Sequence, residues 1–491
     1  MIIETKLGQF TAEKAGQSKD GQPIYRITSI PYAEADPFMP PVLRHNYPQE
    51  KLINSLETFC FPQKRILRWP NLFLKHHMMR AEWLPVHDSF SESAFMLNVW
   101  TSQIENKKPV LVYIHGGGDS GSGTVPIYDG ANLAKQGIVL VTITYRVGLY
   151  GYLPIIENGT VNCNREAKDQ QTALRWIKNH IEYLGGDPNN ITLMGQSGGA
   201  LSSLNQILNQ GDEGLIHKAI LCGGSFMQAR SLQEGEELYQ QFLEQNRLKD
   251  FAALSKLNIK QILRLKGRKA MAEIVDNEFF QEAPKTALEK GHYQPIPLLI
   301  GFNDDEFSMI ELPIYYRAMG IATKAADFQK AIKKKYGVYA EELAAELENE
   351  AENLIDWQIR MMEVAVFYSM NLYLLQQFSK RCPVYGYKFD YVPNLYRGLR
   401  GSYHGAEIAM FFDNLDKMAI QETELNKEEI ALIQNDWLSF IKNGAIPQHS
   451  LYNESKRIIH YSHPVKEISF PHQALIDRWA IPAVYAGLFT G

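Results

Sequence analysis

A serine between glycines stands in a pattern that could make its hydroxyl a nucleophile. Residues 195–199 read G-Q-S-G-G, which fits G-x-S-x-G. They directly follow the apolar stretch Ile191–Met194 and precede an apolar helical pattern that begins at Leu201. Between a strand and a helix this pentapeptide is typical of a nucleophile elbow, a sharp turn that projects the serine hydroxyl. Side chains at the flanking glycines would collide with the neighbouring strand and helix. We therefore predict that Ser197 is a catalytic nucleophile.

A glycine-rich loop upstream could stabilise the negative charge that such an attack creates. Residues 115–118 read H-G-G-G and follow the apolar stretch Val110–Ile114. Without side chains, the backbone N–H groups of such a loop can approach a developing oxyanion closely. The sequence predicts an oxyanion hole made by the N–H groups of Gly117 and Gly118, with that of Gly198 after the serine.

The same glycines also match the dinucleotide-binding fingerprint. Residues 116–121 read G-G-G-D-S-G, which fits G-x-G-x-x-G after a strand. That fingerprint needs a helix that opens at its last glycine and an acidic residue about 20 positions further on. Residues 122–126 are a poor helix start, and the next predicted strand, Ile138–Tyr145, ends without an acid. The sequence therefore favours an oxyanion loop over a nucleotide site.

An activated serine also needs a base and an acid that orients the base. With this elbow they follow the serine in the order acid, then histidine. His404 lies in a glycine-rich loop after the predicted strand Val384–Phe389, where α/β folds place site residues. Three carboxylates follow the predicted strand at 297–302, namely Asp304, Asp305 and Glu306. Spacing predicts His404 as the base and leaves the choice among the three acids open.

The elements that must position these residues are short β-branched strands alternating with longer helices, which predicts an α/β protein with a mostly parallel sheet. A further strand is predicted at Ala219–Cys222, and a helix of about four turns ends near Leu184, before a glycine stop. The stretches at about 232–290 and 310–380 read as helical insertions. Since no linker divides the sequence, we expect residues 1–491 to form one catalytic domain whose insertions surround the active site.

The composition excludes several other classes of protein. The chain is 45% apolar and 11% aromatic, so a large core can form and wholesale disorder is excluded. Its 50 basic and 55 acidic side chains give no electrostatic reason to expect nucleic acid. The four cysteines, none in a CxxC spacing, predict neither a disulfide framework nor a structural zinc site. The N-terminus lacks a secretory apolar region, and no stretch is long enough for a membrane span. We therefore expect a cytoplasmic protein with no membrane partner.

Blocks along nearly the whole sequence resemble the type-B carboxylesterase family, which includes cholinesterases and bacterial para-nitrobenzyl esterases. Besides the H-G-G-G loop and the elbow, the similar blocks are L-N-V-W at 97–100, T-Y-R-V-G at 144–148, D-Q-Q at 169–171 and G-G-D-P at 185–188. The resemblance implies an α/β-hydrolase fold, hydrolysis of small-molecule carboxylic esters, and no cofactor or metal. The family's G-x-N-x-x-E block falls on residues 301–306 and selects Glu306 as the acid. Its G-x-x-H-x-x-E block falls on 401–407 and supports His404.

Several positions depart from the family pattern. Residues 92–94 read E-S-A and lack the family's cysteine, so its first disulfide cannot form, which agrees with a reducing compartment. Asp119 replaces an aromatic residue after the H-G-G-G loop, Gln196 replaces an acid, and Gly223 replaces a serine. The N-x-G-L block before Asp169 is altered to N-R-E-A-K at 164–168. We expect these changes to alter the shape of the pocket and the surroundings of the catalytic residues, and to leave the triad and oxyanion loop intact.

Two alternatives to a carboxylic ester hydrolase remain. A hydrolase-like fold can serve as a non-catalytic binding module, although such proteins typically lose the serine or histidine that this chain retains. The physiological bond can also be an amide, a lactone or a thioester, because the same groups serve all acyl transfers. The sequence favours an esterase of small, largely apolar substrates.

Overall fold

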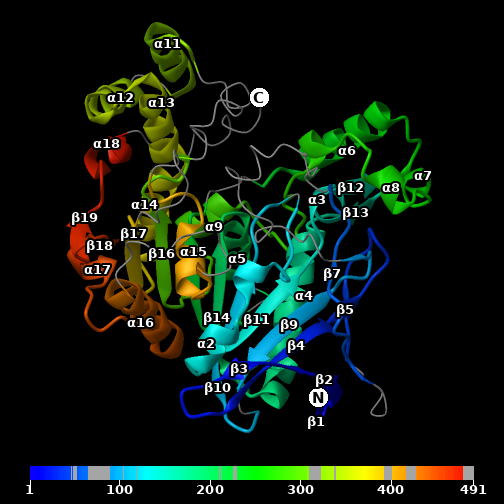
Figure 1. Ribbon diagram of the computed structural model, residues 1–491. Helices are drawn as coiled ribbons and strands as arrows, with labels where there is room; N and C mark the ends of the chain where they lie inside the picture. Colours follow the sequence, from blue (N-terminus) through cyan, green and yellow to red (C-terminus); the bar gives the residue numbers. More distant parts are fainter. Residues whose placement is uncertain are drawn as a thin grey trace, which may run out of the picture. The chain divides into compact units, whose positions relative to one another are not determined.

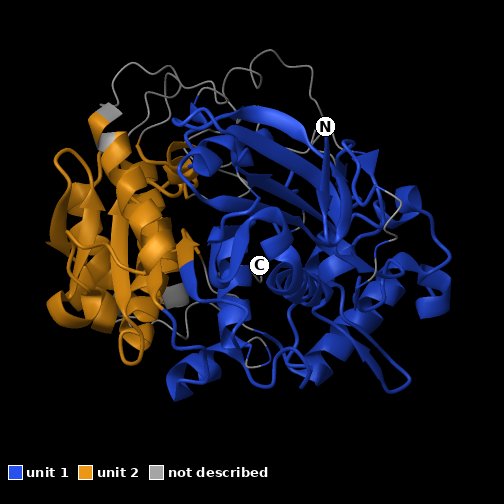
Figure 2. Ribbon diagram, turned by 90° about the horizontal axis from the view of Figure 1, so that it is seen from below, with its two compact units in different colours: residues 1–219, 228–296, 412–418 blue, residues 220–227, 297–411, 419–491 orange. Residues whose placement is uncertain are grey.

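The computed structural model describes residues 1–45, 47, 52–64, 89–102, 104–118, 120–209, 211, 213–224, 229–308, 322–336, 339–391, 401–415 and 427–478. The chain divides into two compact units, which are described separately below (Figure 2). Unit 1 comprises residues 1–219, 228–296 and 412–418. Unit 2 comprises residues 220–227, 297–411 and 419–491.

The strands of unit 1 have a parallel centre. In hydrogen-bonding order they are β14 (Gly186–Gln196), β10 (Lys108–Ile114), β11 (Val139–Thr144), β9 (Met96–Thr101), β4 (Pro23–Pro31) and β3 (Glu13–Gln17). β10 runs parallel to β14 and β11, with Val112 opposite both Leu193 and Val141. The other pairs are antiparallel. Every residue of β11 is buried, as expected of a parallel strand that is covered on both faces.

β10, β11 and β14 lie where the sequence predicts strands, with different ends for β11 and β14, whereas β9, β4 and β3 were not among the predicted strands. β11 stops at Thr144, and β14 begins at Gly186 rather than at Ile191. β14 begins early because Gly186 pairs with Lys108 of β10. A register shift separates this pair from the continuous pairing that starts at Val110 and Ile191. Residues 187–190 of this extension read D-P-N-N, so a search for apolar strands does not detect it.

Two helices of unit 1 pack against this sheet, namely α4 (Arg165–His180) and α5 (Gly198–Leu208). α4 continues into a 3-10 turn at Ile181–Leu184, and Gly185, with a φ of +83°, ends it as the sequence predicts. The stretch at 232–290 contains α6 (Leu232–Asn246), α7 (Phe251–Leu254), α8 (Ile259–Ile262) and α9 (Pro284–Lys290). In Figure 1, α6 packs against β12 (Ile155–Glu157).

Unit 2 has its own set of strands. β16 (Leu298–Asn303), β17 (Val384–Phe389) and β18 (Arg457–Tyr461) are parallel, and β19 (Lys466–Ser469) pairs antiparallel with β18. β15 (Lys218–Cys222) crosses from one unit to the other. The helices of unit 2 include α12 (Tyr339–Glu350), which contacts α11 (Ala325–Tyr336), α13 (Leu354–Glu363) and α18 (Gln473–Arg478), as Figure 1 shows. α14 (Ser369–Phe378) packs on β16 and β17.

Two buried carboxyl groups of unit 1 lie near one another beside α4. Neither oxygen of Glu166 has a hydrogen-bond partner among the described residues. Glu273 is also buried, and its Oε1 accepts a hydrogen bond from Asn205 Nδ2 at 2.7 Å. Burial raises the pKa of Glu166 well above its usual range, and the charge of Glu273 raises it further. The folded protein therefore favours the neutral form of Glu166.

We predict that Glu166→Gln stabilises the protein at alkaline pH. Because the folded-state pKa is raised, the wild type loses stability as the pH rises from the unfolded-state pKa toward the folded one, whereas glutamine has no proton to lose. The thermal midpoint of the variant should exceed that of the wild type by about 1–3 °C at pH 8, and by less at pH 5. Glu244→Gln, an exposed position of α6, is the control and should show no such pH-dependent gain. A midpoint below that of the wild type at pH 8 would contradict the neutral state of Glu166.

Candidate active site

Ser197 occupies a strained turn of unit 1. β14 ends at Gln196 and α5 begins at Gly198, and between them Ser197 adopts a φ of +58° and a ψ of −126°. Such a backbone conformation costs a non-glycine residue on the order of 1–3 kcal/mol. A Cβ atom at Gly195 would lie 2.0 Å from the carbonyl oxygen of Gly199, so a side chain cannot fit there. This strand–turn–helix geometry is that of a nucleophile elbow.

The H-G-G-G loop lies beside this elbow. Gly117 and Gly118 both have positive φ angles, of +107° and +61°, which side chains disfavour. A Cβ atom built on Gly198 would lie 3.5 Å from the backbone nitrogens of both Gly117 and Gly118. Similarly, a Cβ atom on Gly116 would lie 3.1 Å from the Cβ of Ser197. Unit 1 therefore gathers backbone N–H groups of two separate loops next to the serine.

His115 is the first residue of this loop, and both its ring and its backbone carbonyl make contacts that fix its position. Its ring is buried and stacks on Tyr145, with 4.3 Å between the ring centroids. Burial lowers the pKa of His115 to about 4, so the ring is neutral. Nδ1 lies 2.9 Å from the carbonyl oxygen of Gly116, and because a carbonyl only accepts, the proton resides on Nδ1. The hydroxyl of Tyr145 donates to the carbonyl of His115 at 2.7 Å. The sequence offers no direct signal for these two contacts.

His404 and Glu306 meet in unit 2. Nδ1 of His404 lies 2.5 Å from Oε2 of Glu306, and the backbone N–H of Asn303 donates to Oε1 of Glu306 at 2.8 Å. The Glu306 side chain is fully buried, and that of His404 is 25% exposed. Burial lowers the pKa of His404, but the charge of Glu306 and its hydrogen bond outweigh burial, so the pKa is raised above its usual value. A carboxylate that holds Nδ1–H leaves Nε2 as the basic nitrogen.

The three carboxylates that spacing left open have different partners. Asp304 Oδ1 accepts hydrogen bonds from Lys388 Nζ and from the hydroxyl of Tyr368, both at 2.6 Å. Asp305 Oδ2 accepts from a backbone N–H of the loop that carries His404. Among the three, Glu306 is the one whose carboxylate contacts the imidazole.

A second buried carboxyl group, that of Glu407, lies close to this pair, and no role was predicted for it. Asn303 Nδ2 donates to Oε2 of Glu407 at 2.5 Å and to the carbonyl of Tyr403 at 2.7 Å. Burial raises the pKa of Glu407, and the charge of Glu306 raises it further. The signal for Glu407 was its place in the G-x-x-H-x-x-E block, one helical turn after the histidine. Asn303 thus links the two carboxyl groups, since its backbone N–H bonds to Glu306 and its side chain to Glu407.

Two further groups touch the imidazole pair and were not predicted to do so. The ring of Phe367 lies 5.3 Å from that of His404, centroid to centroid. A Cβ atom built on Gly223 would lie 2.9 Å from Oε1 of Glu306 and 3.4 Å from Cε1 of His404. A side chain at position 223 would thus crowd this pair, and the φ of +54° at Gly223 also disfavours one. Asp119, a predicted influence on the oxyanion loop, lies outside the described residues.

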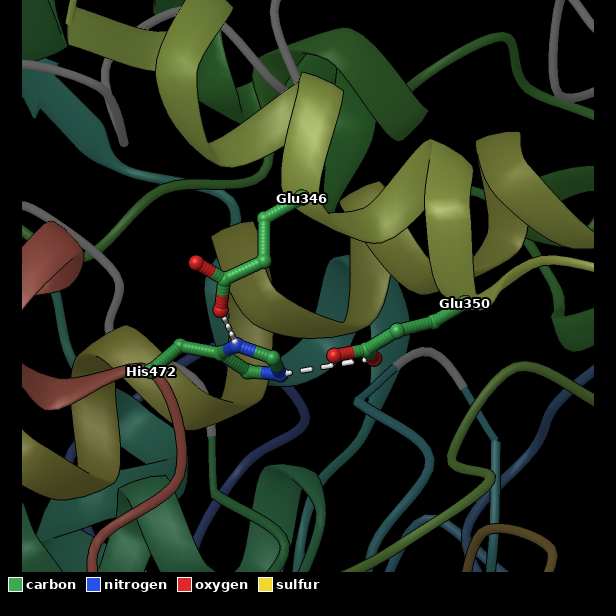
Figure 3. Close-up of side chains that lie close together, drawn as sticks. All are labelled: Glu346, Glu350 and His472. Atoms are coloured by element: carbon green, nitrogen blue, oxygen red, sulfur yellow. Dashed lines mark hydrogen bonds and ion pairs between the residues drawn. The ribbon is translucent and has the colours of Figure 1, made fainter.

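Two side-chain clusters of unit 2 have the residue types of metal sites. One contains Asp304, Asp305 and Asp390, but Asp304 is already paired with Lys388. In the other, shown in Figure 3, Nδ1 of His472 lies 2.7 Å from Oε1 of Glu346, and Nε2 lies 3.9 Å from Oε2 of Glu350. Both ring nitrogens of His472 therefore already face carboxylate oxygens of α12.

The strand–turn–helix elbow, the H-G-G-G loop beside it and the parallel strands flanked by helices define the α/β-hydrolase class, as the sequence predicts. The model of the carboxylesterase family matches residues 1–469, so the chain belongs to that family. A solved structure described as PNB esterase has the same fold, with a TM-score of 0.77 and 23% identity over 98% of this chain and 99% of that one.

Individual relatives agree with this assignment. The chain is 28% identical over 382 residues to the para-nitrobenzyl esterase of Bacillus subtilis (strain 168), covering 72% of this chain and 75% of the relative. It is 29% identical over 376 residues to the phenmedipham hydrolase of Pseudarthrobacter oxydans, covering 72% and 74%. The protein is a carboxylic ester hydrolase, and the prediction of that activity is confirmed. No helix within the described ranges is long and apolar enough to span a membrane.

Proposed function

We propose that the protein cleaves esters of small, largely apolar substrates through an acyl-enzyme, with Ser197, His404 and Glu306 as the catalytic triad. The observation that supports this most strongly is the 2.5 Å hydrogen bond between His404 Nδ1 and the fully buried carboxylate of Glu306. The elbow conformation of Ser197 supports its role as the nucleophile. The names of the relatives, an esterase and a phenmedipham hydrolase, agree with a small-molecule substrate.

The triad acts in two half-reactions. Nε2 of His404 takes the proton of the Ser197 hydroxyl as its oxygen attacks the ester carbonyl, and Glu306 stabilises the imidazolium that forms. The imidazolium then gives this proton to the leaving alcohol, and the acyl group stays on Ser197. In the second half, His404 takes a proton from the water that attacks the acyl-enzyme, and it returns this proton to the Ser197 oxygen as the bond to the acyl group breaks and the carboxylic acid is released.

The oxyanion of both tetrahedral intermediates is held by backbone N–H groups. We assign these donors to Gly117, Gly118 and Gly198, since their backbones cluster beside the elbow. Each such donor typically contributes about 2.7–4 kcal/mol to stabilisation of the transition state. With the charge held by amides and the proton moved by His404, the cycle requires no cofactor.

This proposal makes the two units parts of one catalytic domain, because the triad takes residues from both. We further propose a cytoplasmic location, without nucleic-acid or membrane partners. In support, the sequence lacks the cysteine that the family's first disulfide needs, and its acidic and basic side chains are nearly balanced.

A fluorophosphonate probe tests the proposal directly. The probe phosphonylates a serine only where a base activates it, so we expect stoichiometric labelling of the peptide that contains Ser197. Labelling should be lost in His404→Ala, and heat-unfolded protein serves as the control for non-specific reaction. Labelling of a different serine, or none in the folded protein, would contradict the proposed triad.

A further inference from the structure

We propose that Asp305 is a positioning residue, whose carboxylate fixes the loop that carries His404 so that the imidazole meets Glu306. This inference rests on the proposed function, since it gives Asp305 no contact with the substrate. It assigns a role to one of the two carboxylates that the triad leaves unused, and all the residues involved belong to unit 2.

Two hydrogen bonds join Asp305 to the loop in opposite directions. The backbone N–H of Ser402 donates to Oδ2 of Asp305 at 2.8 Å, and the backbone N–H of Asp305 donates to the carbonyl of Ser402 at 3.2 Å. Ser402 is fully buried and lies two residues before His404. Such a closed pair of bonds fixes both the distance and the direction of the loop relative to the end of β16, where Glu306 also lies.

The neighbouring glycine makes room for this carboxylate. Gly401 has a φ of +77°, and a Cβ atom built on it would lie 1.7 Å from Oδ2 of Asp305. No side chain can therefore occupy position 401 while Asp305 bonds to Ser402. In this chain, the close approach of the Asp305 side chain to the backbone therefore explains why the G-x-x-H-x-x-E block begins with a glycine.

Asp305 makes these hydrogen bonds although burial and nearby acidic groups disfavour its charged form. Among the described residues, the titratable groups that face it are Asp304, Asp390, Arg360 and Glu363, and burial raises the pKa of Glu363 well above its usual range. Burial raises the pKa of Asp305 to about 6, and the charge of Asp304 adds to this, while the bond from Ser402 and the charge of Arg360 oppose it. At pH 7 and above the group is a carboxylate, which accepts the Ser402 N–H more strongly than a neutral carboxyl does.

Loss of the two hydrogen bonds between Asp305 and Ser402 should lower the rate of the chemical step and leave substrate binding largely unchanged. A displacement of about 1 Å in a catalytic group can cost roughly 100-fold in rate. For Asp305→Ala we expect kcat for a short para-nitrophenyl ester to fall by about 10- to 100-fold, with KM within about threefold of the wild type. Asp305→Asn keeps an acceptor oxygen, and should therefore restore kcat to within about fivefold of the wild type.

The pH profile of kcat/KM distinguishes a positioning role of Asp305 from a role in overall protein stability alone. The carboxylates that raise the pKa of His404 are Glu306 and Glu407, so a loosened His404–Glu306 bond should move the acidic limb of the profile to lower pH. We expect this shift in Asp305→Ala and little shift in Asp305→Asn. A wild-type kcat and limb in Asp305→Ala would overturn the inference, as would an equal loss of kcat in the alanine and asparagine variants.

Two further variants complete the test. Gly401→Ala should displace the carboxylate from Ser402 and lower kcat even though Asp305 is present, so the test does not depend on folding of the alanine variant. A wild-type kcat in Gly401→Ala would overturn the inference. His404→Ala separates this inference from the proposed function. If His404→Ala keeps its activity, the triad itself is wrong, whereas an inactive His404→Ala with a fully active Asp305→Ala rejects only the role of Asp305.

Discussion

Replacing Ser197 with alanine should reduce kcat for a short para-nitrophenyl ester by roughly a million-fold. In the proposed mechanism the serine oxygen forms the acyl-enzyme, and residues 195–199 between β14 and α5, G-Q-S-G-G, contain no second hydroxyl. The residual rate, about 10³- to 10⁴-fold above that in water, should come from substrate binding and the oxyanion donors alone. Steady-state kinetics with a stringent check for contaminating wild-type enzyme measures this loss.

A serine of the helix that follows Ser197 provides the matched control. Ser203 is buried in α5, where its hydroxyl donates to the carbonyl of Gly199 at 2.9 Å. Ser203→Ala removes a hydroxyl of the same size from a nearby position, and should keep kcat within about threefold, since a single bond of this kind contributes only about 1 kcal/mol to stability. If Ser197→Ala keeps even a tenth of the wild-type activity, Ser197 is not the nucleophile.

The parts of the fold that local sequence determines were predictable. β17 occupies Val384–Phe389 as predicted, and the elbow lies between a strand and a helix, because β-branched and aromatic strand residues and the glycines of the turn act within a few residues. The polar extension of β14 was not predictable, since it depends on pairing with Lys108, far away along the chain. Local pattern thus predicts where an element is and leaves its ends to tertiary contacts.

Which groups bond to one another within the site could not be predicted from the sequence, because these contacts depend on the tertiary fold. Asp304, Asp305 and Glu306 are adjacent in sequence, yet their carboxylates bond to three different groups, because consecutive residues of a turn point in different directions. Only the family resemblance selected Glu306 in advance. Glu407 was recognised only as the last residue of the G-x-x-H-x-x-E block. Its burial and its hydrogen bond from Asn303 depend on tertiary contacts and could not be inferred from spacing.

Glu306→Gln should lower kcat about 10⁴-fold with little change in the fold. The carboxylate accepts the Nδ1 proton of His404 and the backbone N–H of Asn303, both at short distances. A glutamine can keep the bond from Asn303 with its oxygen, but it then presents an NH₂ group to Nδ1. The imidazole must accept at Nδ1 and carry its proton on Nε2, where it can no longer take the proton of Ser197.

The pH dependence and the adjacent acid make this prediction specific. In the wild type the pKa of His404 is raised, so kcat/KM falls as the pH drops through that value and the base becomes protonated. Loss of the Glu306 charge should move this limb to lower pH. Asp304→Asn removes a neighbouring charge that bonds to Lys388 instead, and should leave kcat within about tenfold of the wild type. Equal losses in the two variants, or a kcat in Glu306→Gln within tenfold of the wild type, would show that a different acid orients the imidazole.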